Sequence, residues 1–247
     1  ANFTTTLANT GNVTVTNNNA NGTVLGNSTI GGTLTLTSAG NVTQFTGENL
    51  QVAGNASITA NSFTASGNNN SLSRLTTNNG DLLIDRVGVV TLGNENITGN
   101  LTVNSKATGF GFNGTYDNNA IVLNNSNIGG TLRLNTANTG ANITGSADIN
   151  QGVNTTITVA GNTTLAGENI TLNNNTNDFN QVSVLTGNNV SLQDANNLTL
   201  GNSNVSGNLT VTSAGTITQN AGTSITVANN ANFTTTLANT GNVTVTN

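Results

Sequence analysis

Hydrophobic and polar residues alternate one by one over many short stretches of this 247-residue chain. In the stretch 31–38 (GGTLTLTS), Leu34 and Leu36 would point to one side of a strand and the threonines to the other. The stretch 207–213 (GNLTVTS) repeats this pattern. Alternation with a period of two predicts β-strands. No stretch shows the three-to-four-residue spacing of an amphipathic helix, so we expect an all-β fold.

The predicted strands come in groups of three. The stretch 32–53 contains three short apolar runs centred on Leu34, Val42 and Leu50, and the stretch 207–228 repeats this arrangement. Glycine-rich openings recur along the chain and divide it into about nine coils of about 25 residues, a spacing typical of solenoids. A single coil cannot bury its own apolar stripe, but stacked coils bury it in continuous columns. We therefore predict a parallel β-solenoid with strands stacked about 4.8 Å apart.

The first seventeen residues, 1–17, return letter for letter as residues 231–247. This repetition predicts that residues 1–230 form one unit of a tandem array and that residues 231–247 begin the next unit. We expect residues 1–247 to form a single continuous solenoid segment. A subunit that polymerises without covalent links is the alternative, but a duplicated sequence within one chain favours covalent tandem repeats.

Composition narrows the possible functions. The chain contains 53 Asn and 47 Thr, has no Pro or Cys, and carries a net charge of −5. Proline cannot donate to a β-ladder, so its absence suits strands that are hydrogen-bonded on both sides. The four cationic residues are scattered, which argues against nucleic acid as a partner; they are Arg74, Arg86, Lys106 and Arg133. No apolar run reaches the roughly 18 residues of a membrane span.

The sequence offers few groups for catalysis. It has no His and no Cys, the usual base and thiolate nucleophile at neutral pH. Asp81 and Asp85 would share a strand face about 13 Å apart, farther than the roughly 5–9.5 Å between glycosidase carboxylates. Glu48, Glu95 and Glu168 are each followed by Asn and then Leu or Ile, which favours a recurring turn position over a metal site. We predict no catalytic residues, cofactor or metal.

Asparagine is unusually frequent in Asn-x-Ser/Thr sequences, of which there are 22. Such triplets place Asn and Thr together on the outer side of a strand, around a buried middle residue. The candidate glycan acceptors are Asn41, Asn96, Asn100, Asn169, Asn208 and Asn242. Alternatively, asparagine side chains stack between coils and form amide ladders, each bonding its counterpart one coil away.

Three Thr-x-Thr strings, which begin at Thr14, Thr35 and Thr210, match the threonine arrays of ice-binding solenoids. An ice-binding surface needs this string in nearly every coil on one face. The stretches GNASITA, GDLLIDR and GTLRLNT interrupt the series, which favours an ordinary strand surface.

The aromatic residues are few. We expect Phe45, Phe63 and Phe179 to fill the core. Three more form a candidate carbohydrate-stacking platform, with core filling as the alternative: Phe110, Phe112 and Tyr116. The longer insertions, 110–119 and 173–180, are predicted to bulge from turns and to offer sites for specific contacts.

Three recurring motifs point to a known family: G-[ND]-[LV]-[TS]-[LV], then A-G-x-[IV]-T-Q, then [LI]-x-V-A. Together they resemble the repeat region of filamentous haemagglutinin-type exoproteins, the large adhesins of bacterial two-partner secretion. The resemblance covers nearly the whole chain and implies a right-handed parallel β-helix, exported through an outer-membrane barrel. Some adhesins of that family are glycosylated at Asn-x-Ser/Thr. The family's Pro-containing secretion motif has no match here, so the export route rests on the shaft pattern alone.

These observations predict a structural, extracellular shaft or filament of a bacterial adhesin or biofilm-matrix protein. The expected partners are neighbouring repeats of the same chain, laterally associated copies, and glycans of the cell surface or matrix. One rival is a carbohydrate-active β-helix enzyme, which requires clustered acids from adjacent coils. The other is a glycan- or ice-binding solenoid.

Overall fold

The computed structural model describes residues 2–5, 11–67, 70–87, 90–106, 119–136, 147–236 and 241–246. Within these ranges the chain is all-β and contains no helix. The strands belong to one winding sheet. Their bounds are β1 Val13–Asn17, β2 Thr23–Leu25, β3 Ser28–Ile30, β4 Leu34–Ser38, β5 Val42–Gln44, β6 Leu50–Ala65, β7 Ser71–Val87, β8 Val90–Leu92, β9 Glu95–Ile97, β10 Leu101–Lys106, β11 Asn119–Leu123, β12 Ser126–Ile128, β13 Leu132–Asn135, β14 Asp148–Gln151, β15 Ile157–Ala166, β16 Ile170–Leu172, β17 Asp178–Gly187, β18 Val190–Asp194, β19 Leu198–Val205, β20 Leu209–Ser213, β21 Ile217–Gln219, β22 Ile225–Val227, β23 Ala231–Thr235 and β24 Val243–Thr244.

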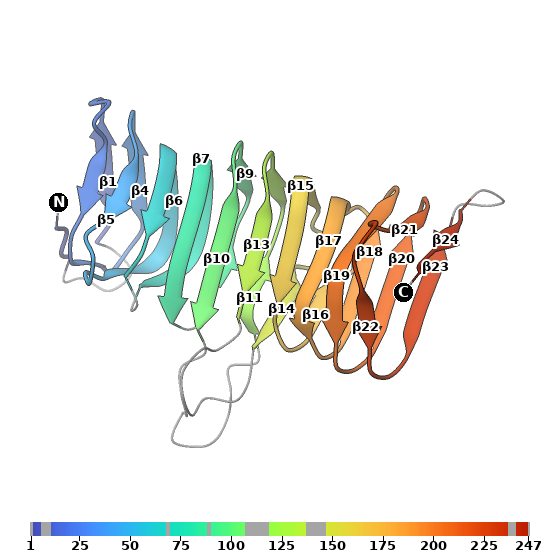
Figure 1. The fold of residues 1–247 in the computed structure, drawn as a ribbon. Coiled ribbons are helices and arrows are strands. Elements are labelled where there is room, and N and C mark those ends of the chain that lie inside the picture. The colour runs from blue at the N-terminus through green and yellow to red at the C-terminus, as the bar shows by residue number, and fades with distance from the viewer. Residues whose placement is uncertain are drawn as a thin grey trace, which may run out of the picture.

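The strands pair in parallel, each with strands one coil before and one coil after it, and form a β-solenoid of about nine turns. One column of Cα partners runs through seven coils: Val90, Ile121, Ile149, Ile170, Val190, Leu209 and Ala231. Figure 1 shows the consequence, because the colour order from blue to red follows the long axis and the two termini lie at opposite ends. The predicted parallel β-solenoid is confirmed.

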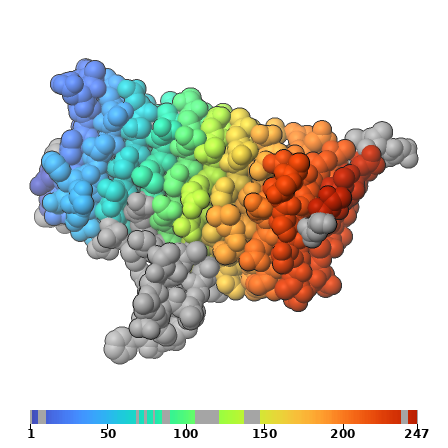
Figure 2. Space-filling model, viewed as in Figure 1, coloured from blue at the N-terminus to red at the C-terminus, as the bar shows by residue number. Residues whose placement is uncertain are grey.

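The interior of the solenoid is a continuous apolar core. Leu34 and Leu36 are buried, while Thr35 and Thr37 between and beside them are exposed, as the alternation predicts. Most other buried residues are Leu, Ile and Val, each stabilising the fold by about 1.5–3 kcal/mol when fully buried. Because partners in successive coils are alike, the core is a set of stacked apolar columns, and the space-filling view shows the coils as successive bands without gaps (Figure 2).

Strands β6 and β7 are longer than the short strands that the sequence predicts. They contain 16 and 17 residues and each follows more than one side of a coil. In β6 the buried side chains fall on even-numbered residues from Leu50 to Ile58 and on odd-numbered residues at Phe63 and Ala65, so the alternation changes phase at Asn61 and Ser62. The corner is therefore made within a hydrogen-bonded strand, where adjacent side chains both point away from the core at the bend.

Three turns share one geometry that braces the corners. In each, the side-chain amide of a glutamine at a strand end donates to the backbone carbonyl four residues later: Gln44 to Glu48 at 2.8 Å, Gln151 to Thr155 at 3.1 Å and Gln219 to Thr223 at 2.6 Å. The residue three positions after each glutamine has a positive φ: Gly47 at 83°, Asn154 at 57° and Gly222 at 74°. Glycine and asparagine tolerate this left-handed conformation, which explains their recurrence at this position.

Two of these turns are clasped by the following coil. Asn70 and Gln44 exchange two amide hydrogen bonds of 2.7 and 2.9 Å, and Asn177 and Gln151 exchange two of 2.6 and 2.8 Å. Asn70 and Asn177 are almost fully buried. The sequence predicts that the insertion 173–180 bulges outward. In the structure Asn177 instead folds back and closes the turn of the preceding coil.

Candidate functional site

The outer surface of the solenoid is lined by asparagines that connect successive coils. An asparagine just before a strand accepts a hydrogen bond, through its side-chain oxygen, from a backbone N–H of the next coil. Examples are Asn12 to Thr33 at 2.8 Å, Asn100 to Thr131 at 2.8 Å, Asn125 to Thr156 at 2.9 Å and Asn197 to Thr216 at 2.8 Å. These side chains satisfy N–H groups at the corners of the coils, where regular strand pairing stops.

Some of these asparagines also bond to one another and form amide ladders, as one of the two sequence-based hypotheses predicts. In the first ladder each Nδ2 donates to the Oδ1 one coil earlier: Asn169 to Asp148 at 3.0 Å, Asn189 to Asn169 at 3.1 Å and Asn208 to Asn189 at 3.1 Å. In the second ladder Asn96 donates to Asn78 at 3.0 Å and Asn127 donates to Asn96 at 3.3 Å. The asparagine content of the chain thus has a structural use in coil-to-coil register.

The six candidate glycan acceptors fall into two groups. Three of them donate their Nδ2 hydrogens within the ladders: Asn96, Asn169 and Asn208. The other three are exposed, and their Nδ2 groups donate no hydrogen bond within the described ranges: Asn41, Asn100 and Asn242. Because glycans attach to Asn side chains at Asn-x-Ser/Thr, the second group is the more accessible one. Glycosylation of any of them stays a prediction.

Three buried polar residues interrupt the apolar core on the side of the coil that contains β9. Thr77, Glu95 and Ser126 stack in consecutive coils, are 3–4% exposed, and replace the apolar partners found above and below them. The Thr77 hydroxyl donates to Glu95 Oε2, and the Gly93 backbone N–H donates to Glu95 Oε1 at 3.0 Å. We call these three residues the polar stack. Glu95 is thus not the turn residue that the sequence predicts, whereas Glu48 and Glu168 do lie in turns before strands.

Two of the other acids, Asp81 and Asp194, accept hydrogen bonds from backbone N–H groups. Asp81 is exposed and accepts from the Asn100 backbone N–H at 2.6 Å, while the side chain of Asp85 lies outside the described part of the structure. Asp194 and Asp178 come from adjacent coils. Asp194 is 1% exposed, and its two oxygens accept backbone N–H groups of Phe179 at 2.7 Å and Asn196 at 2.8 Å. This carboxyl braces a corner and faces away from solvent.

Burial raises the pKa of the Asp194 carboxyl above its ordinary value of 3.8. The backbone N–H groups of Phe179 and Asn196 act in the opposite direction, and the charge of Asp178 adds to the increase. Burial disfavours the ionised form because a charge loses its hydration in the core.

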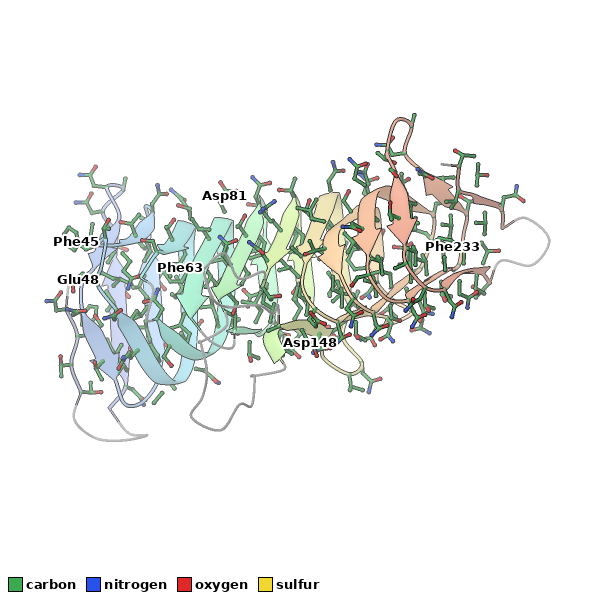
Figure 3. All side chains as sticks on the ribbon, turned by 60° about the horizontal axis from the view of Figure 1, so that its bottom comes forward. Phe45, Glu48, Phe63, Asp81, Asp148 and Phe233 are labelled. Atoms are coloured by element: carbon green, nitrogen blue, oxygen red, sulfur yellow. The ribbon has the colours of Figure 1, made fainter. Side chains whose placement is uncertain are left out.

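The aromatic predictions have mixed outcomes. Phe63 and Phe179 are fully buried, as expected for core residues. The prediction for Phe45 is wrong, since its side chain is 59% exposed. Figure 3 shows Phe45 beside Glu48 at the outside of a coil, where it follows Gln44 in the braced turn. The candidate platform of Phe110, Phe112 and Tyr116 lies outside the described residues, as does most of the insertion 110–119.

The Thr-x-Thr strings do not form one array. The strings at Thr14 and Thr35 are in register on β1 and β4, and Ser57 and Thr59 of β6 continue both rows. The stretch GNASITA therefore continues the rows with one serine and does not interrupt them. Thr210 lies on β20, which pairs with β18 and β23. A short two-row hydroxyl surface thus lies on the first coils, and Thr210 is apart from it.

A shallow hollow of about 320 Å³ lies on the face of β9, β12 and β15. It is lined by Asn94, Glu95, Asn96, Asn125, Ser126, Asn127, Thr156 and Thr158. Its rim consists of amides and hydroxyls, which suit hydrogen bonding to hydroxyl-rich ligands, but several of these groups already bond between coils.

No group of three or more acidic residues that could hold a metal ion occurs among the residues described. In the same part of the chain there is no helix able to cross a membrane.

The geometry thus consists of stacked coils held by core columns, amide ladders and clasped turns, and the fold is that of a repeat-built structural solenoid. The sequence matches one family in three places, at residues 10–78, 111–186 and 187–247, which together cover most of the chain. This chain belongs to that family, the repeats of unknown function (DUF5649). No curated protein and no solved structure matches it. The three matches show that the family's repeat recurs within the chain. They do not test the predicted 230-residue unit, which stays a prediction.

Proposed function

We propose that this chain is a segment of an extracellular shaft or filament of a bacterial adhesin or biofilm-matrix protein. Its role would be mechanical: it would hold a binding region away from the cell, or join neighbouring cells through the matrix. The resemblance to filamentous haemagglutinin-type exoproteins supports the location and the export by two-partner secretion.

One observation supports this role above the others, the unbroken column of Cα partners from Val90 to Ala231. Each coil bonds to the coil before it and the coil after it, so a pull along the axis is shared by the hydrogen bonds and apolar contacts of every interface. The amide ladders add side-chain links at the corners. A rod of this kind resists bending without any cofactor or ligand.

The chemistry of the outer surface also suits an extracellular structural part. Only 5% of the residues are charged, and the exposed strand positions are mainly Thr, Asn and Ser. Such a surface stays hydrated at any ionic strength, because its hydration depends little on charge. Exposed asparagines in Asn-x-Ser/Thr sequences would carry glycans in a host that glycosylates such sites.

Immunogold electron microscopy of intact cells tests this proposal. Antibodies against the segment should decorate thin filaments outside the cell, and brief treatment of intact cells with an external protease should remove the label. Label confined to the cell interior and protected from the protease would contradict the location. Labelled compact particles, in place of filaments, would contradict the mechanical role.

A shaft segment carries out no reaction. A direct check is incubation of the purified chain with bacterial and plant polysaccharides, followed by measurement of new reducing ends. Release above the level of a heat-denatured sample would favour the rival carbohydrate-active enzyme.

A further inference from the structure

The two glutamine–asparagine pairs that close turns within the solenoid match each other bond for bond, and we call each pair a clasp. Gln44 is clasped by Asn70 and Gln151 by Asn177, and the partners are 26 residues apart in both clasps. Each glutamine ends a strand of one coil, and each asparagine directly precedes a strand of the next coil. The Nε2 of the glutamine donates to the asparagine Oδ1, and the asparagine Nδ2 donates back to the glutamine Oε1. Each clasp therefore ties two successive coils together at a corner.

Each clasp asparagine also completes the backbone hydrogen bonding of the coil before it. Asn70 Oδ1 accepts the Leu50 backbone N–H at 2.8 Å, and Asn177 Oδ1 accepts that of Ile157 at 3.0 Å. Regular strand pairing begins one residue later, so each asparagine stands opposite the residue whose N–H it binds. An amide thus stands in the core beside an apolar residue of the preceding coil.

Burial makes these amides depend on their partners. Gln44 is 7% exposed, Asn70 is 1% exposed and Asn177 is fully buried. Loss of one member of a clasp leaves buried donors and acceptors unsatisfied in both coils at once, and such groups are costly in the core. An exposed ladder asparagine such as Asn127 differs, because water can replace its lost partner.

The clasps follow the family matches. The match at residues 10–78 contains the whole of the first clasp, and the match at residues 111–186 contains the whole of the second. The match at residues 187–247 keeps the braced turn at Gln219 but has Val245 where the other two have a clasp asparagine. The clasp is thus a recurring feature of the family's repeats that individual repeats can have or lack.

We propose that each clasp is a joint that makes the two coils it connects open as one unit. In a stacked repeat protein each coil contacts only its neighbours, so a stack without joints can open one coil at a time. A clasped coil cannot leave its neighbour without breaking buried bonds that belong to both coils. Under tension along a shaft, clasped coils would therefore yield together. This last consequence rests on the proposed function, whereas the coupling itself does not.

Native-state hydrogen exchange of the full chain, measured residue by residue by NMR, tests the coupling. Asn177→Ala should raise the exchange rate of the Ile157 amide by about tenfold or more, because this N–H loses a buried acceptor. The variant should also raise the exchange rate of the Gly167 amide. Gly167 donates to the Thr186 carbonyl at 3.1 Å, at a different corner of the same two coils, so it reports whether the coils open together.

Two further variants are the matched controls. Asn70→Ala makes the same change in the other clasp, so it should raise the exchange rate of the Leu50 amide and leave Ile157 and Gly167 unchanged. Asn127→Ala removes an exposed ladder bond on the coil before Ile157, and it should leave the Ile157 and Gly167 amides unchanged as well.

Faster exchange at Ile157 with an unchanged rate at Gly167 in N177A would overturn the proposal, because the clasp would then be a local brace. Unchanged rates at both amides would overturn it too. If N177A lost its β-sheet circular dichroism spectrum, Gln151→Glu would make the same comparison at a partly exposed position, since it removes the two bonds that Gln151 donates. These rates are measured on the purified chain, so their outcome is separate from the location of filaments on cells.

Discussion

Two stacks in the interior of the solenoid solve the same packing problem with different chemistry. The apolar stack consists of Val90, Ile121, Ile149, Ile170, Val190 and Leu209, all buried and paired coil to coil. The polar stack consists of Thr77, Glu95 and Ser126, equally buried but held by specific hydrogen bonds. In the apolar stack the contacts are non-directional, so one aliphatic residue can stand for another of similar volume. In the polar stack Thr77 and Glu95 depend on each other, and the Ser126 hydroxyl donates to the Asn124 carbonyl of its own coil at 3.1 Å.

The difference teaches where this fold tolerates variation. Exchange of one aliphatic residue for another in the apolar stack changes packing volume only. Loss of one partner in the polar stack leaves a buried polar atom unsatisfied, which costs about 1–3 kcal/mol. We therefore expect repeats with aliphatic substitutions to fold well and repeats with isolated polar substitutions to fold poorly.

The largest effect should come from breaking the backbone ladder beside the apolar stack. Val211→Pro lies in the middle of β20, which pairs with β18 and β23, so proline removes a ladder bond and adds a steric clash. The free energy of unfolding should fall by about 3 kcal/mol or more. Denaturant unfolding followed by circular dichroism measures this change. Val211→Ala is the control for the lost side chain, and an equal loss in both variants would show that the ladder bond is unimportant.

Next in size is a cavity in the apolar stack. Ile170 is fully buried between Ile149 and Val190. Ile170→Ala should lower the free energy of unfolding by about 2–5 kcal/mol, because the neighbouring coils cannot collapse onto the space. The neighbouring outward residue provides the control: Thr171→Ala should change it by less than about 0.5 kcal/mol. Similar values for both variants would contradict the assignment of inside and outside.

A smaller loss is expected in the polar stack. Thr77→Val keeps the shape of the side chain but removes the hydroxyl that donates to Glu95. The free energy of unfolding should fall by about 1–3 kcal/mol, because Glu95 keeps its place in the core with one donor fewer. Thr77→Ser retains the hydroxyl and should lose less. If T77S were the more damaging of the two in thermal unfolding, methyl packing and not hydrogen bonding would determine this site.

The smallest effect concerns pH and Asp194, a buried carboxyl outside the polar stack. Burial raises the pKa of Asp194 in the folded state above the unfolded value of 3.8. The protonated form is thus favoured by folding, so this group's contribution is fully present below the unfolded pKa and is lost as pH rises through the folded pKa. Denaturation midpoints should be measured from pH 3 upward, at pH values roughly one unit apart. They should fall as the pH rises through the folded-state pKa of Asp194. In Asp194→Asn the fall should be smaller, and an unchanged slope would refute the assignment to Asp194.

Most of the fold could be predicted from the period-two pattern. Leu34, Val42 and Leu50 lie in three successive strands, and the apolar side of each faces the core. The stacking of asparagines could also be predicted, because Asn recurs at the residue before an inward position. These features depend only on the order of neighbouring residues along the chain, so they can be predicted from the sequence.

Two of the wrong predictions, for Glu95 and Phe45, concern residues whose place in the strand alternation points to the observed burial. Glu95 is two positions before the buried Ile97, so its side chain points to the same side of the strand. Phe45 directly follows the inward Gln44, so its side chain points to the opposite, outer side. The alternation alone cannot show whether a buried Glu finds a hydrogen-bond donor. Its partner Thr77 is in another coil, and coil lengths vary, so the pairing depends on a register that the sequence does not display.

The central claim is that successive coils lie directly on one another with the stated register, and disulfide trapping tests it most directly. The chain contains no Cys, and Thr171 and Ser191 are outward Cα partners on β16 and β18. At a strand spacing of about 4.8 Å, Thr171→Cys with Ser191→Cys falls within the Cα separation of about 4.4–6.8 Å that a disulfide requires. Mild oxidation should link this pair within the monomer and should not link Thr171→Cys with Thr210→Cys, two coils apart. Equal linking of both pairs, or of neither, would contradict the stacked solenoid.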